Sequence, residues 1–273
     1  MSACSRRCLE DQHRLVVNTV ARTESQSNDK FAGRWFWSYA SPAAFFPVAG
    51  KLEKCCWILA AVLAVIGLYM GFFVAPTDAQ QGEVYRVIFI HVPAAWMTMV
   101  VYMAMAFWAA TGLVLGTRLS FMMSHALAPT GAIMAVVALV TGSLWGRPTW
   151  GTYWVWDARL TSTLILFFLY VGYMALAASF DDKKKGDRAS ALIALVGAIN
   201  VPIIYFSVKW WNTLHQGASV RPGSSSMAST MLTAMMIMTV AFWFYCIAAA
   251  LHRLRTDIIE RERNAAWLKE AIK

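Results

Sequence analysis

The sequence predicts an all-α, polytopic integral membrane protein with six transmembrane helices and both termini in the cytoplasm. Three observations predict this fold class. Hydrophobic residues make up 59% of the 273-residue chain and charged residues only 14%, well below the roughly 25% of a soluble domain. Six long segments contain no Asp, Glu, Lys or Arg. The basic residues gather in alternate connections between these segments, as they do in proteins that span a membrane.

Each apolar segment has about the 20 residues that a helix needs to cross the hydrocarbon core of a bilayer. No strand-like alternation and no internal repeat competes with a helical interpretation. In the fifth segment, Asn200 and Pro202 raise the question of a broken helix, and we expect a kink that packs against neighbouring helices. The predicted spans are residues 57–74, 87–110, 126–146, 160–180, 189–208 and 228–251.

The positions of the basic residues predict the orientation. Most of the 24 Lys and Arg residues lie in the N-terminal segment, in the sequence DDKKKGDR after the fourth span, and in the C-terminal tail. Arg118, after the second span, lies on the same side as these segments, and the exceptions on the other side are Arg86, Arg147, Arg159, Lys209 and Arg221. Because cytoplasmic loops are enriched in basic residues, both termini are predicted to be cytoplasmic. The net charge of +9 then needs no nucleic acid as a partner.

This topology predicts three segments along the chain. Residues 1–50 form a cytoplasmic N-terminal extension, residues 51–252 a six-span membrane domain, and residues 253–273 a cytoplasmic tail with a helical pattern. The membrane domain carries two unusual outer loops, at residues 145–160 and 209–227.

Several function classes are disfavoured by what the chain lacks. The five Cys residues are scattered and form no C-x-x-C-H haem-attachment motif, which argues against a disulfide framework and a c-type cytochrome. No G-x-x-x-x-G-K-[ST] motif occurs, so any ATP hydrolysis would come from a partner. The chain offers no evident nucleophile. The sequence therefore favours a scaffold over an enzyme, without deciding the question.

The most unusual segment is the outer loop at residues 145–160, WGRPTWGTYWVWDARL. One interpretation is an aromatic belt, because Trp is enriched at membrane interfaces. Belt residues are usually sparse, whereas here they fill a loop, which favours a binding platform. Two glycines and Pro148 favour an irregular loop over a helix. The tryptophans are Trp145, Trp150, Trp154 and Trp156.

Two histidines are predicted at a similar depth on the outer side. His91 lies near the outer end of the second span, and His215 lies in the third outer loop. An ionisable residue inside a span is costly and by default marks a functional site. The plainer interpretations are a neutral imidazole bonded to a neighbouring helix for His91 and an ordinary loop residue for His215.

These residues together suit haem. Imidazole is a common axial ligand of haem iron, and a porphyrin has a flat apolar face on which aromatic rings can stack. Its propionates need cations, and Arg binds carboxylates in a bidentate manner. Arg86, Arg147 and Arg159 are candidates, although each could instead mark the membrane interface. Asp157 could orient a ligand or pair with Arg159.

Three long segments resemble a known group of proteins. WGRPTWGTYWVWDARLTS resembles the tryptophan-rich WWD signature of the haem-handling proteins of cytochrome c maturation. APTDAQQGEVYRVIFIHVPAAW and NVPIIYFSVKWWNTLHQGAS resemble the histidine-bearing segments of one family, haem exporter protein C or CcmC. The resemblance covers residues from about 50 to 252. The six spans and the HVPAAW context favour this family over the larger CcmF and CcsA types.

The resemblance implies that the protein binds haem b at the periplasmic face of the bacterial inner membrane and delivers it to the haem chaperone CcmE. It implies that His91 and His215 are the axial ligands, with a platform formed by Trp145, Trp150, Trp154, Trp156 and Asp157, beside the candidate arginines Arg86 and Arg159. It also implies an assembly with the ABC transporter subunits CcmA and CcmB and the small membrane protein CcmD. Two other classes stay open: a membrane b-type cytochrome, and a transporter of haem or another small molecule.

Overall fold

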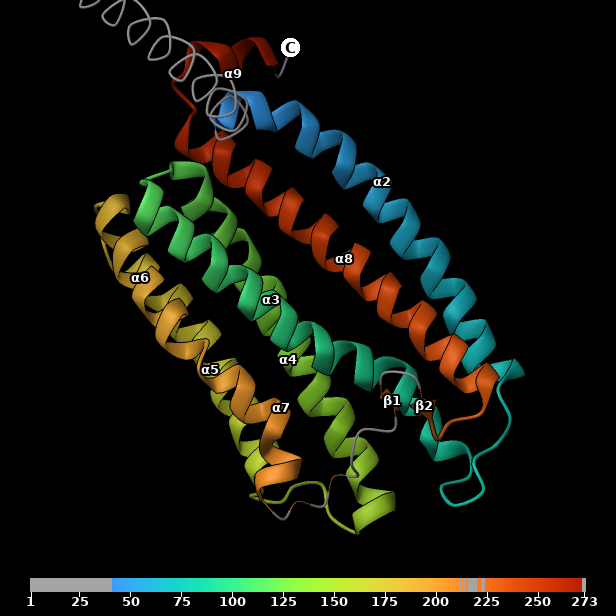
Figure 1. The fold of residues 1–273 in the computed structure, drawn as a ribbon. Helices are drawn as coiled ribbons and strands as arrows, with labels where there is room; N and C mark the ends of the chain where they lie inside the picture. Colours follow the sequence, from blue (N-terminus) through green and yellow to red (C-terminus); the bar gives the residue numbers. More distant parts are fainter. Residues whose placement is uncertain (1–40, 212, 214, 216–219, 222–223, 272–273) are drawn as a thin grey trace, which may run out of the picture. The chain divides into compact units, whose positions relative to one another are not determined.

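The computed structural model describes residues 41–211, 213, 215, 220–221 and 224–271. Residues 46–273 form one compact helical unit. Its elements, drawn in Figure 1, are α2 (Pro42–Tyr69), the π-helical turn η1 (Met70–Val74), the 3-10 turn η2 (Glu83–Val87), α3 (Ile88–Leu115), α4 (Arg118–Trp150), α5 (Ala158–Ala178), α6 (Lys183–Gly197), α7 (Asn200–Trp210), the two-residue strands β1 (Val220–Arg221) and β2 (Ser224–Ser225), α8 (Ser229–Arg261) and α9 (Ala266–Ala271).

The six predicted spans are confirmed as six helices or helix pairs that are long and apolar enough to cross a membrane. Successive spans run in opposite directions (Figure 1). The connections after α2, α4 and α7 therefore lie at one end of the helices, and the connections after α3 and α5 lie at the other. The loops that carry the tryptophans and His215 consequently share an end with the N-terminal turns of α3, where His91 lies.

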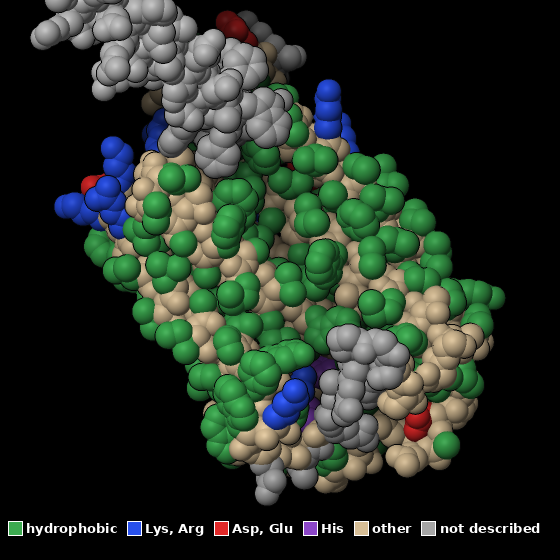
Figure 2. Space-filling view, in the orientation of Figure 1, with side chains coloured by type: hydrophobic (Ala, Val, Ile, Leu, Met, Phe, Trp, Pro, Cys, Tyr) green, Lys and Arg blue, Asp and Glu red, His purple; other side chains and the backbone are tan. Residues whose placement is uncertain are grey.

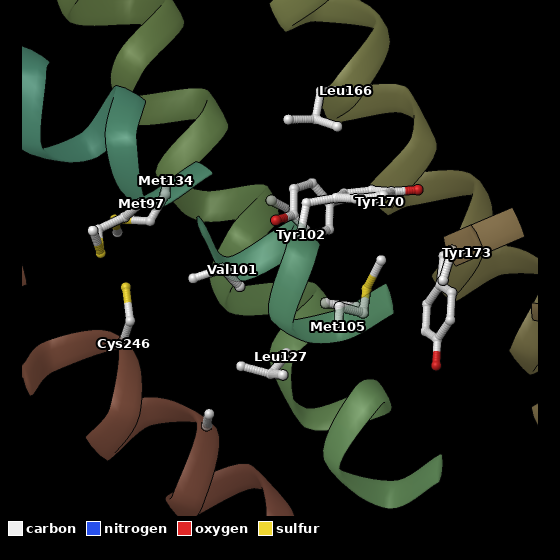
Figure 3. Packing of buried hydrophobic residues seen from close by; sticks show 14 of the residues in the cluster. Met97, Val101, Tyr102, Met105, Leu127, Met134, Leu166, Tyr170, Tyr173 and Cys246 are labelled. Atoms are coloured by element: carbon white, nitrogen blue, oxygen red, sulfur yellow. The ribbon is translucent and has the colours of Figure 1, made fainter. Parts of the chain in front are cut away.

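The centre of the unit is formed by α3 and α4, which pack along each other, with α5 and α6 on one side and α8 on another. Three buried tyrosines join these helices (Figure 3). Tyr170 on α5 donates to the Thr98 carbonyl on α3 at 2.8 Å, and Tyr173 donates to Ser124 Oγ on α4 at 3.0 Å. Because a lipid environment supplies little hydrophobic drive between helices, such packing and hydrogen bonds hold spans together.

The fifth span is broken close to Asn200 and Pro202, the two residues that suggested a possible break in the sequence. α6 ends at Gly197, and α7 begins at Asn200. The buried Asn200 side chain donates from Nδ2 to the Ser162 carbonyl on α5 at 2.8 Å. The break is therefore packed against a neighbouring helix, as expected, and the buried Asn200 amide finds its partner there.

The tryptophan-rich segment begins as a helix, so the prediction of an irregular loop from its glycines and Pro148 was wrong for its first part. α4 runs through Pro148 to Trp150 and ends at Gly151, whose φ of 78° only glycine adopts easily. The Gly151 N–H caps the helix by donating to the Arg147 carbonyl at 3.1 Å. Pro148 has no N–H to donate to the Leu144 carbonyl, so the last turn of α4 lacks one helical hydrogen bond. Only residues 151–157 form the irregular loop.

Candidate functional site

His91 is held by a hydrogen bond that fixes its tautomer. Its Nδ1 lies 3.0 Å from Thr141 Oγ1 on α4. The Thr141 hydroxyl donates its own proton to the Val137 carbonyl at 2.6 Å, as threonines inside helices often do. The hydroxyl oxygen is thus the acceptor for the Nδ1–H of His91. Nε2 then carries the free lone pair, which is the form in which a histidine binds a metal.

His215 is held in the same way by a carboxylate. Its Nδ1 lies 3.1 Å from Asp157 Oδ2. The other oxygen of Asp157 accepts the Leu160 N–H at 2.7 Å and caps the first turn of α5. The start of α5 therefore fixes the carboxylate, and the carboxylate orients the imidazole. This carboxylate–histidine arrangement leaves Nε2 free and is typical of the outer shell of metal sites.

The electrostatics of this region favour a neutral His215. Burial lowers the pKa of the His215 imidazole, and the nearby Arg159 charge lowers it further, while Asp157 acts in the opposite direction. The pKa therefore lies below the usual value of about 6.5, and the ring is neutral at pH 7. His91 also lies close enough to Arg159, and to His215 when that ring is protonated, to interact with them electrostatically. The structure thus brings the two histidines and Arg159 into one region.

Arg159 is the least satisfied charge in this region. It lies in the first turn of α5 and is half-buried. Within the residues that the structure describes, its guanidinium forms no ion pair, although Asp157 is near enough for its charge to act on it. A half-buried cation without a partner is costly, so Arg159 is suited to a ligand that brings a negative group.

The tryptophans divide into two groups. Trp145 packs edge to face on His91, with 5.7 Å between ring centroids, and Trp150 packs in the same manner on His215 at 4.9 Å. Both come from the end of α4, so one helix end supports both imidazoles. Trp154 and Trp156 pack against each other at 5.5 Å in the loop that follows. Trp154 is half-buried, whereas Trp156 is 75% exposed.

Arg86 and Arg147 are engaged in local structure. Arg86 donates to the carbonyls of Gly71 and Ala75 and pairs with Glu83, which ties η1 to η2 and the connection between them. Arg147 donates to the Gly151 carbonyl. Arg159, rather than either of these, has a guanidinium that is available for a carboxylate.

Sequence reasoning missed three residues that support the histidines. Thr141 holds His91, and Gln81 Oε1 accepts the indole N–H of Trp145 at 2.9 Å. Gly142 leaves room for the His91 ring: a Cβ at this position would lie 2.8 Å from His91 Cε1. The sequence did carry a signal, since the pair Thr141–Gly142 interrupts an apolar run one turn before Trp145.

Replacement of Gly142 by alanine should displace the His91 ring, because the added Cβ cannot sit 2.8 Å from Cε1. Overpacking of this kind costs about 1–3 kcal/mol, and we expect weaker haem binding. Haem titration of purified Gly142→Ala measures the effect. Gly172→Ala is the matched control, since no atom lies within 4 Å of its added Cβ. Equal haem affinity in the two variants would contradict the prediction.

Replacement of Asp157 by alanine should remove both the helix cap and the support of His215. Loss of an N-cap costs about 1 kcal/mol of stability, and loss of an outer-shell partner lowers metal affinity by about 10- to 100-fold. Asp182 caps α6 through the Lys184 N–H at 2.9 Å and contacts no histidine, so Asp182→Ala isolates the capping effect. Thermal melting and haem titration of both variants separate the two losses. Haem affinity that falls equally in both would show that Asp157 acts only as a cap.

The fold and the site define a class: an all-helical membrane protein with six spans that holds two oriented histidines and a tryptophan cluster at one end of its helices. The model of the family described as "CcmC: Heme exporter protein C" matches residues 35–269, and the chain belongs to this family.

Individual relatives agree with this assignment. A "Heme exporter protein C" of Bradyrhizobium diazoefficiens is 45% identical over 235 residues, which covers 85% of this chain and 88% of the relative. The protein of the same name from Haemophilus influenzae is 40% identical over 237 residues, covering 86% of this chain and 96% of the relative. A "Putative cytochrome c biosynthesis ccmC-like mitochondrial protein" of Marchantia polymorpha is 45% identical and covers 73% of this chain and 83% of the relative.

Proposed function

We propose that this protein binds haem b at the periplasmic face of the bacterial inner membrane and delivers it to the haem chaperone CcmE for cytochrome c maturation. The observation that carries the proposal is the pair of imidazoles, each held through Nδ1, an arrangement that suits ligation of iron through Nε2. The family and the names of its members support haem as the cargo.

In this proposal, each residue of the site has a separate task. His91 and His215 ligate the iron through Nε2, and Thr141 and Asp157 keep both rings oriented. Arg159 binds a propionate through its free guanidinium. Trp145 and Trp150 support the imidazoles and cover the porphyrin edge, and the exposed Trp156 offers an aromatic surface to the chaperone.

The position of the site fits a hand-over rather than permanent storage. The ligands come from a loop and from helix ends instead of from the middle of the bundle. A ligand at such an edge can leave without opening the helical core. Histidine side-chain atoms are visible at the surface at this end of the unit, next to a basic side chain (Figure 2).

The basic segments favour an orientation with both termini in the cytoplasm, which places the haem site outside. Any ATP hydrolysis would come from the partner subunits CcmA and CcmB, with CcmD as a further member of the assembly. The chain itself then acts as a delivery scaffold rather than an enzyme.

The proposal is tested by transfer. Purified protein loaded with haem is mixed with purified CcmE, and the two are separated under denaturing conditions that leave only covalent haem attached. We expect the amount of haem bound to CcmE to rise as the amount bound to this protein falls. Haem that stays bound and only cycles between ferric and ferrous forms would contradict the proposal and indicate a b-type cytochrome.

A further inference from the structure

An apolar groove runs between α5 and α6, away from the histidine site. Its walls and floor are formed by Phe168, Leu169, Gly172, Leu192, Ile193 and Val196. Its volume of about 330 Å³ is at the lower end of the range of ligand pockets. No atom lies within 4 Å of a Cβ built on Gly172, so this glycine leaves the floor of the groove open.

The α6 wall of the groove continues into a pair of exposed cations. Lys185, Arg188, Leu192 and Val196 follow one another at intervals of three or four residues, which places them on one face of the helix. All four are exposed; Leu192 is 59% and Val196 68% exposed. One stripe of α6 therefore passes from positive charge at the start of the helix to an apolar groove.

The positive charge at the start of α6 is only partly neutralised within the protein. Four basic residues lie there, Lys183, Lys184, Lys185 and Arg188, together with Asp181, Asp182 and Asp187. Asp187 is committed to Arg261 on α8, through contacts of 2.7 and 3.1 Å. In the part of the chain that the structure describes, neither Lys185 nor Arg188 forms an ion pair. Figure 2 shows basic side chains gathered near the end at which α6 begins.

The spacing along α6 matches the dimensions of a phospholipid. A helix rises 1.5 Å per residue, so Leu192 and Val196 lie roughly 6 and 12 Å beyond Arg188 along the axis. The headgroup region of a leaflet is about 5–8 Å thick. A phosphate at Lys185 and Arg188 would thus have its acyl chain beside Leu192 and Val196.

We propose that Lys185, Arg188 and the α5–α6 groove form a binding site for an anionic phospholipid, with its phosphate on the two cations and one acyl chain in the groove. Charge selects this occupant over a neutral lipid, and the wholly apolar lining selects a hydrocarbon chain. The site is separate from the proposed haem site, because among the described residues the contacts of the two histidines involve Thr141, Asp157, Trp145 and Trp150 and no residue of the groove.

The test compares phosphatidylglycerol with phosphatidylcholine of identical acyl chains, added to the delipidated full-length protein and measured by native mass spectrometry. Two surface charges near an anionic lipid are worth about tenfold or more in affinity, so we expect a preference of that size for phosphatidylglycerol. Lys185→Gln with Arg188→Gln should reduce the preference to about twofold or less. Gly172→Leu should fill the groove and weaken the binding of both lipids.

Matched controls separate the site from general effects. Lys51→Gln with Lys54→Gln removes two exposed cations from α2, and Val65→Phe enlarges a side chain that is 68% exposed; neither should change lipid binding. Gel filtration and helical circular dichroism establish that each variant is folded, and the single variants Lys185→Gln and Arg188→Gln provide a second series. An unchanged preference in the double charge variant, or unchanged binding in Gly172→Leu, would overturn the proposal. The proposal would also be overturned if a polypeptide co-purified with the wild-type protein and Gly172→Leu removed that polypeptide but left lipid binding unchanged.

Discussion

Protein in which both His91 and His215 are replaced by alanine should purify with haem at background level. Each imidazole is oriented by its own hydrogen bond, to Thr141 or to Asp157, and we propose that each supplies one axial bond. Removal of a single ligand should lower haem affinity by at least about tenfold, since even the loss of an outer-shell partner costs that much. The pyridine haemochrome assay gives the ratio of haem to protein.

The control for this experiment is another histidine outside the site. His252 lies on α8 and contacts Glu53 at 2.8 Å, and Glu53 also contacts Arg255 at 2.6 Å, so it would retain one partner without the imidazole. His252→Ala should therefore remain folded and retain the wild-type haem content. If the double variant of His91 and His215 also retained it, the assignment of the axial ligands would be wrong.

The second large effect is expected at Arg159. Because its guanidinium has no ion-pair partner among the described residues, a propionate would form new charge-assisted hydrogen bonds with it. Such bonds contribute about 1.5–3 kcal/mol, so Arg159→Gln should weaken haem binding by roughly 10- to 150-fold. Titration of the detergent-purified protein with haem measures the loss.

Two comparisons make this test specific to a carboxylate. Haem dimethyl ester has no propionate charge, so it should bind wild type and Arg159→Gln with similar affinity. Arg147→Gln removes an arginine that already donates to the Gly151 carbonyl, and we expect little change in haem affinity. A loss for the ester as large as the loss for haem would show that Arg159 supports the fold of the site instead.

The helices could be predicted because their signals are local. Uncharged apolar runs of about 20 residues and the alternation of basic connections are sufficient to place six spans. Asn200 and Pro202 also signalled the break between α6 and α7 at nearly the right position. The residue types of the candidate site followed from the sequence as well, because a histidine within a span and a histidine and a tryptophan cluster in connecting loops are conspicuous.

The remaining features depend on contacts between distant segments. Glycine and proline content did not predict that α4 extends through Pro148. The extended helix packs Trp145 on His91 and Trp150 on His215, and these contacts join segments that are far apart in the sequence. Arg86 is engaged by a carbonyl 15 residues away in the sequence. Arg159 has no ion-pair partner among the described residues. Neither fact could be read from the sequence around the two arginines. Asp157 proved to orient His215 and to cap α5 at once, whereas the sequence left open a pairing with Arg159.

The central claim is that His91 and His215 together ligate one haem iron. Electron paramagnetic resonance of the ferric, haem-loaded wild-type protein tests it most directly, because two imidazole ligands give a low-spin signal. We expect a low-spin spectrum for wild type and a high-spin spectrum for His91→Ala and for His215→Ala, each of which retains a single ligand. A high-spin wild-type protein, or a single variant whose low-spin spectrum equals that of wild type, would contradict the claim.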